Sequence, residues 1–403
     1  MKNSEFIESI TNKESFIDNK NFEIEIITPI HIGSGRVLNR GLDFTTSDSH
    51  TLIYNINKLI SAFGEQQSFI DAITNGTISG FLRENGIPEV EYSRALNGNC
   101  DANDLDEFIS DGNDNPFIPG SSVKGGIRTA FFEYYFNNNG NGVNNDYKRL
   151  LIRSKTWASQ RLQEKVLAPK YKRDKIFKSA QNADILRSLR VSDVSFKNND
   201  LCVVNALIMN LKGNDGYDYG WKHLPSKRTN RSMADATSVP VVALKPGVIS
   251  KSFKLSIDEF ILKFVSTKEK NWERFSEILN DHYEDLINKE MDYVEPLPEN
   301  EETDSIFNQL NYLIDEVADC RKNTANGRVS WIQRIGWGSG WTTMTGGHVP
   351  ENLLNDVRLQ YYLNTNRQGL RYPVFPKTRK IVKGVDNELR MLGWIKVTEE
   401  KES

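Results

Sequence analysis

The sequence predicts an α+β fold, in which strands and helices do not alternate as regular βαβ units. Apolar and charged residues alternate in NFEIEII, which is typical of a half-buried strand. The runs LCVVNALIMNL and SVPVVALKPGVISKSFKLSI also have the composition of strands. Because these runs do not alternate regularly with helices, we expect no doubly wound parallel sheet.

Each predicted element has its own local signal. The first strand, near residues 22–26, ends in a glycine turn. Apolar residues recur at helical spacing over residues 123–134, and Ser121 or Ser122 is the expected N-cap of that helix. The dipeptide Pro246-Gly247 predicts a turn between two further strands.

Composition narrows the classes of protein. The chain has 403 residues, of which 38% are hydrophobic and 10% aromatic, which suits two or three globular domains. Its three cysteines and five histidines show no ligand spacing, so we expect no disulfide, metal site or cofactor. The N-terminal residues lack an apolar signal sequence, and no run reaches the roughly 18 apolar residues of a membrane span. We therefore expect a soluble, cytoplasmic protein.

Charge is unevenly distributed, although the formal net charge of the chain is only −3. Residues 121–255 hold 24 lysine and arginine residues against 10 aspartate and glutamate residues. The densest basic run, residues 148–178, interleaves cations with aromatic residues, which suits nucleic-acid binding but equally a solvated helical face. Residues 258–319 are acidic with a helical pattern, and we expect them to contact protein or solvent.

The stretch FIPGSSVKGGIRTAFFEYYF, residues 117–136, places a Gly-Ser turn before a helix. Such a helix start presents unpaired N–H groups to an anion. The spacing differs from that of a nucleotide-binding P-loop, because Lys124 precedes Gly125 and Gly126. Lys124 and Arg128 lie four residues apart, on one face of the predicted helix.

A second glycine cluster, RIGWGSGWTTMTGG, occupies residues 334–347. Gly336, Gly338 and Gly340 form G-x-G-x-G and not the dinucleotide fingerprint G-x-G-x-x-G. Taken alone, this cluster is a tight turn whose tryptophans fill the core. The later run VFPKTRKIV crowds three cations into residues 377–380 and predicts a cationic edge.

Several blocks of the sequence carry a family resemblance. They are TPIHIGSGR, FIPGSSVKGGIRTAF, LRVSDVSF, RIGWGSGW, VFPKTRKIV and LGWIKV, in this order. Together they closely resemble the RAMP proteins of CRISPR systems, and more narrowly the fifth subunits of the type III-A Csm effector complex. The resemblance spans Thr28 to about Val397, nearly the whole chain.

The resemblance implies two fused RAMP modules, each a ferredoxin-like βαββαβ fold with glycine-rich loops. On this basis we expect an N-terminal module over residues 1–200 with a basic helical insertion. We expect a C-terminal module over residues 201–403 with an acidic helical insertion at about 258–320. The implied protein is no enzyme but a subunit that binds CRISPR RNA (crRNA), caps its 3′ end in the complex and is needed for its 3′-end maturation in antiviral defence.

The resemblance also implies partners and site residues. The partners are crRNA, the backbone RAMP subunit and the small helical subunit of the Csm complex, with target RNA and a host nuclease that trims the crRNA as further candidates. Glycine loops and cations would bind phosphates with little base selectivity, since the guide sequence varies. The expected RNA-binding residues are His31, Gly33, Ser34, Gly35, Arg36, Gly120, Ser121, Ser122, Lys124, Arg128, Gly336, Gly338, Gly340, Trp341, Lys377 and Arg379.

Structural and catalytic alternatives remain for some of these residues. Gly125 and Gly126 also suit close helix packing, with Lys124 solvated. His31 beside its glycine turn suggests an alternative function, a metal-independent endoribonuclease with His31 as general base. No partner residue stands at a defined spacing from His31, which favours a structural or RNA-contacting histidine. Asp193 is more simply explained by capping a turn or pairing with Arg190, so we expect no catalytic residue.

Overall fold

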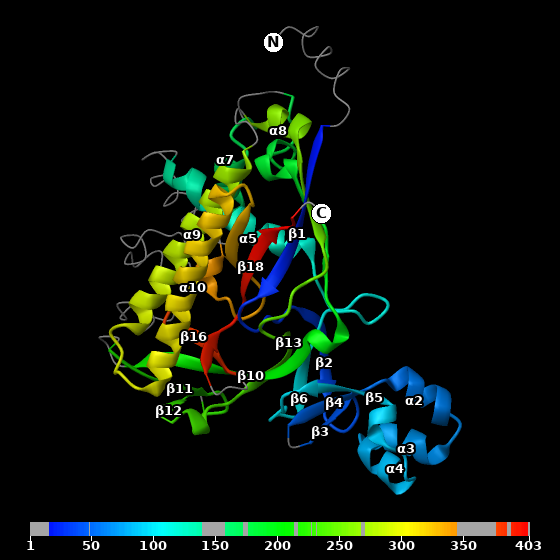
Figure 1. Ribbon diagram of the computed structural model, residues 1–403. Coiled ribbons are helices and arrows are strands. Elements are labelled where there is room, and N and C mark those ends of the chain that lie inside the picture. The colour runs from blue at the N-terminus through cyan, green and yellow to red at the C-terminus, as the bar shows by residue number, and fades with distance from the viewer. Residues whose placement is uncertain are drawn as a thin grey trace.

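The fold of the protein is described from a computed structural model and consists of two β-sheets with helices packed around them (Figure 1). The structure describes residues 16–47, 49–138, 158–171, 176–212, 217–226, 228–230, 232–266, 271–344, 376–384 and 388–401.

The first sheet, sheet A, has five strands in the order β15-β18-β1-β14-β8, all paired antiparallel. The strands are β1 (Ile17–Ile26), β8 (Leu189–Val191), β14 (Phe253–Asp258), β15 (Ser330–Arg334) and β18 (Trp394–Glu399). In β1 the side chains of Phe22, Ile24 and Ile26 are buried while the glutamates between them are half-buried, as the alternation predicts.

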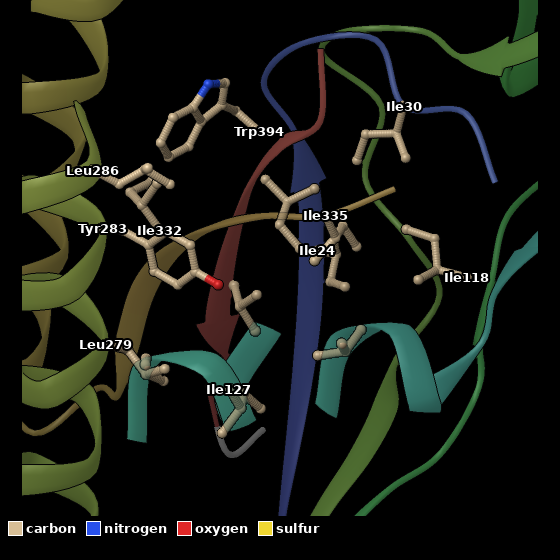
Figure 2. Close-up of a cluster of buried hydrophobic side chains, with 14 of the residues drawn as sticks. Ile24, Ile30, Ile118, Ile127, Leu279, Tyr283, Leu286, Ile332, Ile335 and Trp394 are labelled. Carbon is tan, nitrogen blue, oxygen red and sulfur yellow. The ribbon is translucent and has the colours of Figure 1, made fainter. Parts of the chain in front are cut away.

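Three helices cover sheet A. They are α5 (Gly120–Asn138), α9 (Trp272–Val294) and α10 (Glu301–Ala325), and α9 and α10 run side by side (Figure 1). Figure 2 shows Ile127 from α5 and Leu279 and Tyr283 from α9 meeting Ile24 of β1. Along the chain, β1, α5, β8, β14, α9 and β15 follow one another as a β-α-β-β-α-β unit, with β18 inserted beside β1.

The second sheet, sheet B, has eleven strands, with a main path in the order β2-β6-β13-β10-β5-β4-β3. Strands β11 and β16 also pair with β10, and they carry β12 and β17 respectively. Its strands are β2 (Gly33–Asn39), β3 (Phe44–Thr46), β4 (His50–Tyr54), β5 (Ser93–Asn97), β6 (Asp104–Phe108), β10 (Leu201–Lys212), β11 (Asp218–His223), β12 (Arg228–Asn230), β13 (Val239–Leu244), β16 (Thr378–Lys383) and β17 (Leu389–Met391).

Shorter elements complete the described chain. Strands β7 (Phe117–Ile118) and β9 (Val194–Ser195) form a separate ladder. Helix α7 (Ala158–Leu167) packs against α5, and α8 (Glu259–Val265) lies beside the start of β1 (Figure 1). The 3-10 helices are Glu89–Glu91, Gln181–Ala183, Ile185–Ser188, Asn198–Asp200, Met233–Asp235 and Trp341–Thr343.

A small helical lobe lies between β4 and β5. It comprises α2 (Ile56–Phe63), α3 (Gln67–Asn75) and α4 (Ile78–Glu84), and it projects from sheet B away from sheet A (Figure 1). Its buried residues, Leu59, Phe69, Ala72, Ile78, Phe81 and Leu82, form a cluster with Tyr54 at the end of β4 that is separate from the main core.

The α+β class predicted from the sequence is confirmed, and the turn at Pro246-Gly247 joins β13 to β14 through a positive φ of 80° at Gly247. The predicted N-cap is wrong. The helix already begins at Gly120, and Ser121 and Ser122 lie in its first turn. The N–H of Gly120 donates instead to the Asp193 carboxylate at 2.7 Å, from a segment 73 residues away.

Both sheets combine strands from before and after residue 200. The acidic region is helical as predicted, but α9 and α10 bury one face against sheet A and supply much of the core. Among the described residues, none of the helices is both long and apolar enough for a membrane span.

Candidate nucleic-acid interface

The two glycine loops predicted from the sequence are anchored to the same turn. Residues after β1 and residues after β15 both bind the backbone just before β18. The Gly393 N–H donates to the Pro29 carbonyl at 3.0 Å, and the Gly393 carbonyl accepts from the Ile335 N–H at 2.8 Å. This shared turn brings segments about 300 residues apart in sequence to one place.

The first loop follows at residues 31–36 and the second at residues 336–343, and they touch directly. The Trp337 N–H donates to the His31 carbonyl at 2.8 Å. Gly336 has a φ of 84°, and a Cβ there would lie 2.7 Å from the same carbonyl oxygen. Only glycine satisfies both conditions, so Gly336 sets how closely the loops approach.

The buried side chain of His31 packs beneath the contact between the two loops. Its side chain is 2% exposed, and its Nδ1–H donates to the Val242 carbonyl at 2.6 Å. The imidazole packs edge-on against Phe108 and Trp337. Burial lowers the pKa of His31 from its ordinary value, so the ring is neutral at pH 7. These contacts favour the structural interpretation of His31 over that of a general base.

A cation lies above the second loop. The Lys380 Nζ is 3.5 Å from the centroid of the Trp337 ring, a cation–π contact. Burial lowers the pKa of Lys380, and the nearby charge of Asp106 acts in the opposite direction. Lys380 is half-buried, so its ammonium is partly desolvated and available to an anion that approaches the loops.

The first loop offers an exposed surface beside this cation. Gly33, Ser34, Gly35 and Arg36 are all exposed at the start of β2. The Ser34 hydroxyl accepts from the Arg36 N–H at 3.0 Å and donates to Glu107 at 2.9 Å. The Arg36 guanidinium pairs with Asp43 at 2.6 Å, but its side chain remains 55% exposed.

Gly338 and Gly340 complete the second loop. Both have φ angles near 90°, and within the described chain no heavy atom stands within 4 Å of a Cβ built on Gly340. The Ser339 hydroxyl donates to the Gly336 carbonyl at 2.8 Å and accepts from Thr343 at 3.0 Å. Trp341 is half-buried at the end of the loop. The loop is therefore ordered by its own hydroxyls and presents open backbone at Gly340.

The two cations of the predicted segment 117–136 lie on α5 and bind groups of the protein itself. The Lys124 Nζ donates to the Leu189 carbonyl at 2.6 Å, and the Arg128 guanidinium pairs with Asp184 at 2.6 Å. Ser121, which is exposed, and the half-buried Ser122 remain on the first turn, while Gly120 is buried. RNA contact by Lys124 and Arg128 stays a prediction, and their observed contacts fix α5 to the 184–189 segment.

The cationic edge at residues 377–380 divides between two faces. Side chains alternate along β16, so Arg379 is buried against Glu290 while Lys380 faces Trp337. Lys377 is half-buried, and its carbonyl accepts from the Tyr293 hydroxyl at 3.1 Å. The sequence pattern named Arg379 as a site residue, whereas its neighbour Lys380 is the one placed beside the loops.

The predictions for Asp193 and for the basic run at residues 148–178 concern regions outside the two loops. Asp193 binds the start of α5 as described above, and Arg190 pairs with Asp258 at 2.6 Å. Of the basic run at 148–178, residues 148–157 and 172–175 lie outside the described residues. Lys170 within the run donates to the Phe264 and Ser266 carbonyls at 3.1 Å each, which caps α8.

Comparison with known proteins identifies the family. The sequence model of the RAMP superfamily matches residues 23–342, which are most of the chain. The chain therefore belongs to the RAMP superfamily. A Streptococcus thermophilus protein described as CRISPR system Cms protein Csm5 is 29% identical over 157 residues, which are 33% of this chain and 43% of that protein. The chain thus matches less than half the length of this curated relative.

Two solved structures are similar over nearly the whole chain. One belongs to the cryo-EM structure of a Csm–crRNA–target RNA ternary complex of a type III-A CRISPR-Cas system, with 18% identity, 95% of this chain and 100% of that chain covered, and a TM-score of 0.60. The other is the crystal structure of T. onnurineus Csm5, with 18% identity, coverages of 93% and 99%, and a TM-score of 0.54. At this identity the likeness establishes the fold, and the resemblance predicted from the sequence blocks is confirmed.

Proposed function

We propose that the protein is a non-catalytic subunit that binds crRNA, caps its 3′ end in a type III-A Csm complex and is needed for its 3′-end maturation. The observation that carries the proposal is the junction of the two glycine loops, with exposed backbone at residues 33–36 and at Gly340 and with Lys380 beside Trp337. Open backbone and a partly desolvated cation recognise phosphates without reading bases, as a variable guide requires.

Similarity to Csm5 supports the remaining parts of this proposal. Its partners would be crRNA, the backbone RAMP subunit, the small helical subunit and target RNA in the cytoplasm. We also propose that the β-α-β-β-α-β unit of sheet A is one ferredoxin-like module and that sheet B contains the second ferredoxin-like module. The acidic outer faces of α9 and α10 would then point toward protein or solvent, because they repel phosphate.

Replacement of Lys380 by methionine tests RNA binding at the loops. Lys380→Met keeps the aliphatic stem against Trp337 but removes the charge, so affinity should fall alike for single-stranded RNAs of unrelated sequence. The slope of log affinity against log salt should fall by about 0.7 if one phosphate contact is lost. Lys383→Met, on the exposed end of the same strand, is the matched control. Unchanged affinity and slope in folded Lys380→Met would refute the proposed interface.

The capping role needs a separate experiment. The protein would be reconstituted with the other Csm subunits, and the bound crRNA would be sized after nuclease trimming. We expect complexes that lack this subunit to carry crRNA with altered 3′ ends, and purified protein alone to leave repeat-containing RNA uncut with or without chelator. Correctly trimmed crRNA in its absence would contradict the capping role while leaving RNA binding intact.

A further inference from the structure

A buried ionic network lies beneath the junction of the loops. On α9, Glu290 Oε1 accepts from Arg334 Nη1 at 3.2 Å, and Oε2 accepts from Arg379 Nε. The side chains of Glu290 and Arg334 are each 1% exposed, and that of Arg379 is 7% exposed. Burial by itself raises the pKa of Glu290, but the charges of Arg379 and Arg334 outweigh it and hold the pKa below its ordinary value.

The Arg334 side of the network reaches both glycine loops. Arg334 ends β15, two residues before Gly336, and its Nε donates to the Leu392 carbonyl at 3.0 Å. Leu392 directly precedes Gly393, the residue that binds Pro29, two residues before the first loop. Glu290 Oε1 also accepts from the Thr342 hydroxyl at 3.4 Å, at the far end of the second loop. The Glu290 carboxylate is therefore connected to both ends of the second loop. Through Arg334 and the turn at residues 392–393 it is also connected to the segment that leads into the first loop.

The Arg379 side orients the strand that carries Lys380. The Arg379 guanidinium lies 4.0 Å from the centroid of the Tyr293 ring, and its Nη1 donates to the Pro376 carbonyl at 2.6 Å. Adjacent residues of a strand point to opposite faces. The contacts that hold the Arg379 side chain on the buried face of β16 therefore also hold the Lys380 side chain on the opposite face, over Trp337.

Stability alone does not explain such a network. A buried ion pair pays a desolvation penalty that often cancels its attraction, and apolar replacements of similar size are often equally stable. Charge-assisted hydrogen bonds from a guanidinium are directional, however, and they specify one geometry. We infer that Glu290 is a positioning residue, which contacts no ligand itself but holds the two glycine loops and Lys380 in the arrangement that binds RNA. This inference rests on the proposed RNA-binding function.

An apolar replacement of the whole network separates positioning from stability. In the triple variant Glu290→Leu, Arg334→Met, Arg379→Met we expect a melting temperature equal to or above that of the wild type. We expect RNA affinity to fall by about ten- to a hundred-fold, the range for lost charge-assisted hydrogen bonds, although Lys380 is retained. Arg321→Met, which removes the partly exposed pairs of Arg321 on α10 with Asp281 and Glu284 on α9, should change neither quantity.

A second readout does not depend on RNA. Hydrogen exchange of the Trp337 amide, which donates to His31, should accelerate in the RNA-free triple variant and not in Arg321→Met. Wild-type affinity in the folded triple variant, or unchanged exchange at Trp337, would overturn the inference. Faster exchange in a protein whose wild type binds no RNA would refute the proposed function and leave the positioning of the loops supported.

A gentler variant covers the case in which the triple variant does not fold. Thr342→Val removes one hydroxyl donor to Glu290 and leaves the ionic network in place. Weaker RNA binding together with faster exchange at Trp337, at an unchanged melting temperature, would support the inference. Wild-type values of both quantities in Thr342→Val would overturn it.

Discussion

Two neighbouring glycines on α5 differ sharply in the space around them. A Cβ on Gly126 would lie 2.2 Å from Gln333 Nε2 and 2.7 Å from the Tyr283 hydroxyl oxygen. Gln333 is itself fixed, because its Nε2 donates to the Val123 carbonyl at 2.8 Å. At Gly125 no heavy atom of the described chain lies within 4 Å of the added Cβ. Close packing therefore explains Gly126 and leaves Gly125 without a structural requirement.

This difference gives a paired prediction. Gly126→Ala should lower the free energy of unfolding by about 1–3 kcal/mol, because a well-packed contact must be forced apart. Gly125→Ala should leave it unchanged or raise it by up to about 1 kcal/mol, since alanine favours the helix. Urea denaturation of both variants measures the difference. Equal effects of the two substitutions would show that α5 can shift away from β15 at little cost.

His31 should make stability depend on pH. Its pKa is lowered in the folded protein from the ordinary value of 6.5, so the unfolded chain takes up a proton that the folded protein does not. The contribution is present above about pH 6.5 and is lost as pH falls toward the folded pKa, with a slope of up to about 1.4 kcal/mol per pH unit. Denaturation between pH 5 and 7 would measure this slope.

The matched variant is His31→Asn, whose amide can still donate to the Val242 carbonyl but does not titrate. The pH slope of the wild type should exceed that of His31→Asn over this range. Identical slopes would mean that His31 takes up its proton equally in the folded and unfolded protein, which would reopen its interpretation as an acid–base group.

At the level of elements, local patterns predicted what lies along the chain but not what each side chain meets. The alternation around Ile24 and the apolar spacing of α5 gave the right elements, because both depend on neighbours in sequence. Lys124 and Arg128 were expected to contact phosphate, yet Leu189 and Asp184 hold them. Those partners lie more than 50 residues away, and no spacing rule connects them.

The alternation rule would have separated Arg379 from Lys380. Because β16 is a strand, adjacent side chains point to opposite faces, and the apolar Ile381 marks the buried face on which Arg379 also lies. The sequence could not predict that the buried carboxylate of Glu290 contacts Arg379 on that face. A single glutamate within an acidic helix carries no signal of burial.

The helical lobe allows a prediction about an element as a whole. Tyr54 and Ser93 face each other in the antiparallel pair of β4 and β5, so a two-residue turn can join them directly. Replacing residues 55–92 by Asn-Gly should retain the main unfolding transition, with a loss of no more than about 1 kcal/mol, because the lobe has its own core. Thermal unfolding followed by circular dichroism tests this.

Phe69→Ala is the control for the lobe. It should loosen the lobe alone, seen as faster amide exchange in α3 and α4, while the main transition is kept, since Phe69 belongs to the lobe cluster and not to the main core. Loss of the main transition in either variant would show that the lobe and the sheets unfold as one unit.

On the scale of the whole molecule, the candidate interface is a product of topology. Its two loops belong to segments about 300 residues apart, and the pairing of both with the turn before β18, together with the Trp337–His31 hydrogen bond, brings them together. Sequence blocks could mark the loops individually through their glycines. Their contact could not be predicted, because it depends on the order of strands in a sheet that draws on both ends of the chain.

The place of β18 also has a consequence for the timing of folding in the cell. β1 ends at Ile26, but its neighbour β18 begins only at Trp394. At about 5–20 residues per second, the ribosome needs roughly 20–70 s between the two strands. During that interval one edge of β1 has no native partner, and such an edge is open to pairing with other chains. The β1–β18 pair, and the loop junction beside it, therefore cannot form until Trp394–Glu399 has been made, and until then the unpaired edge of β1 favours association between nascent chains.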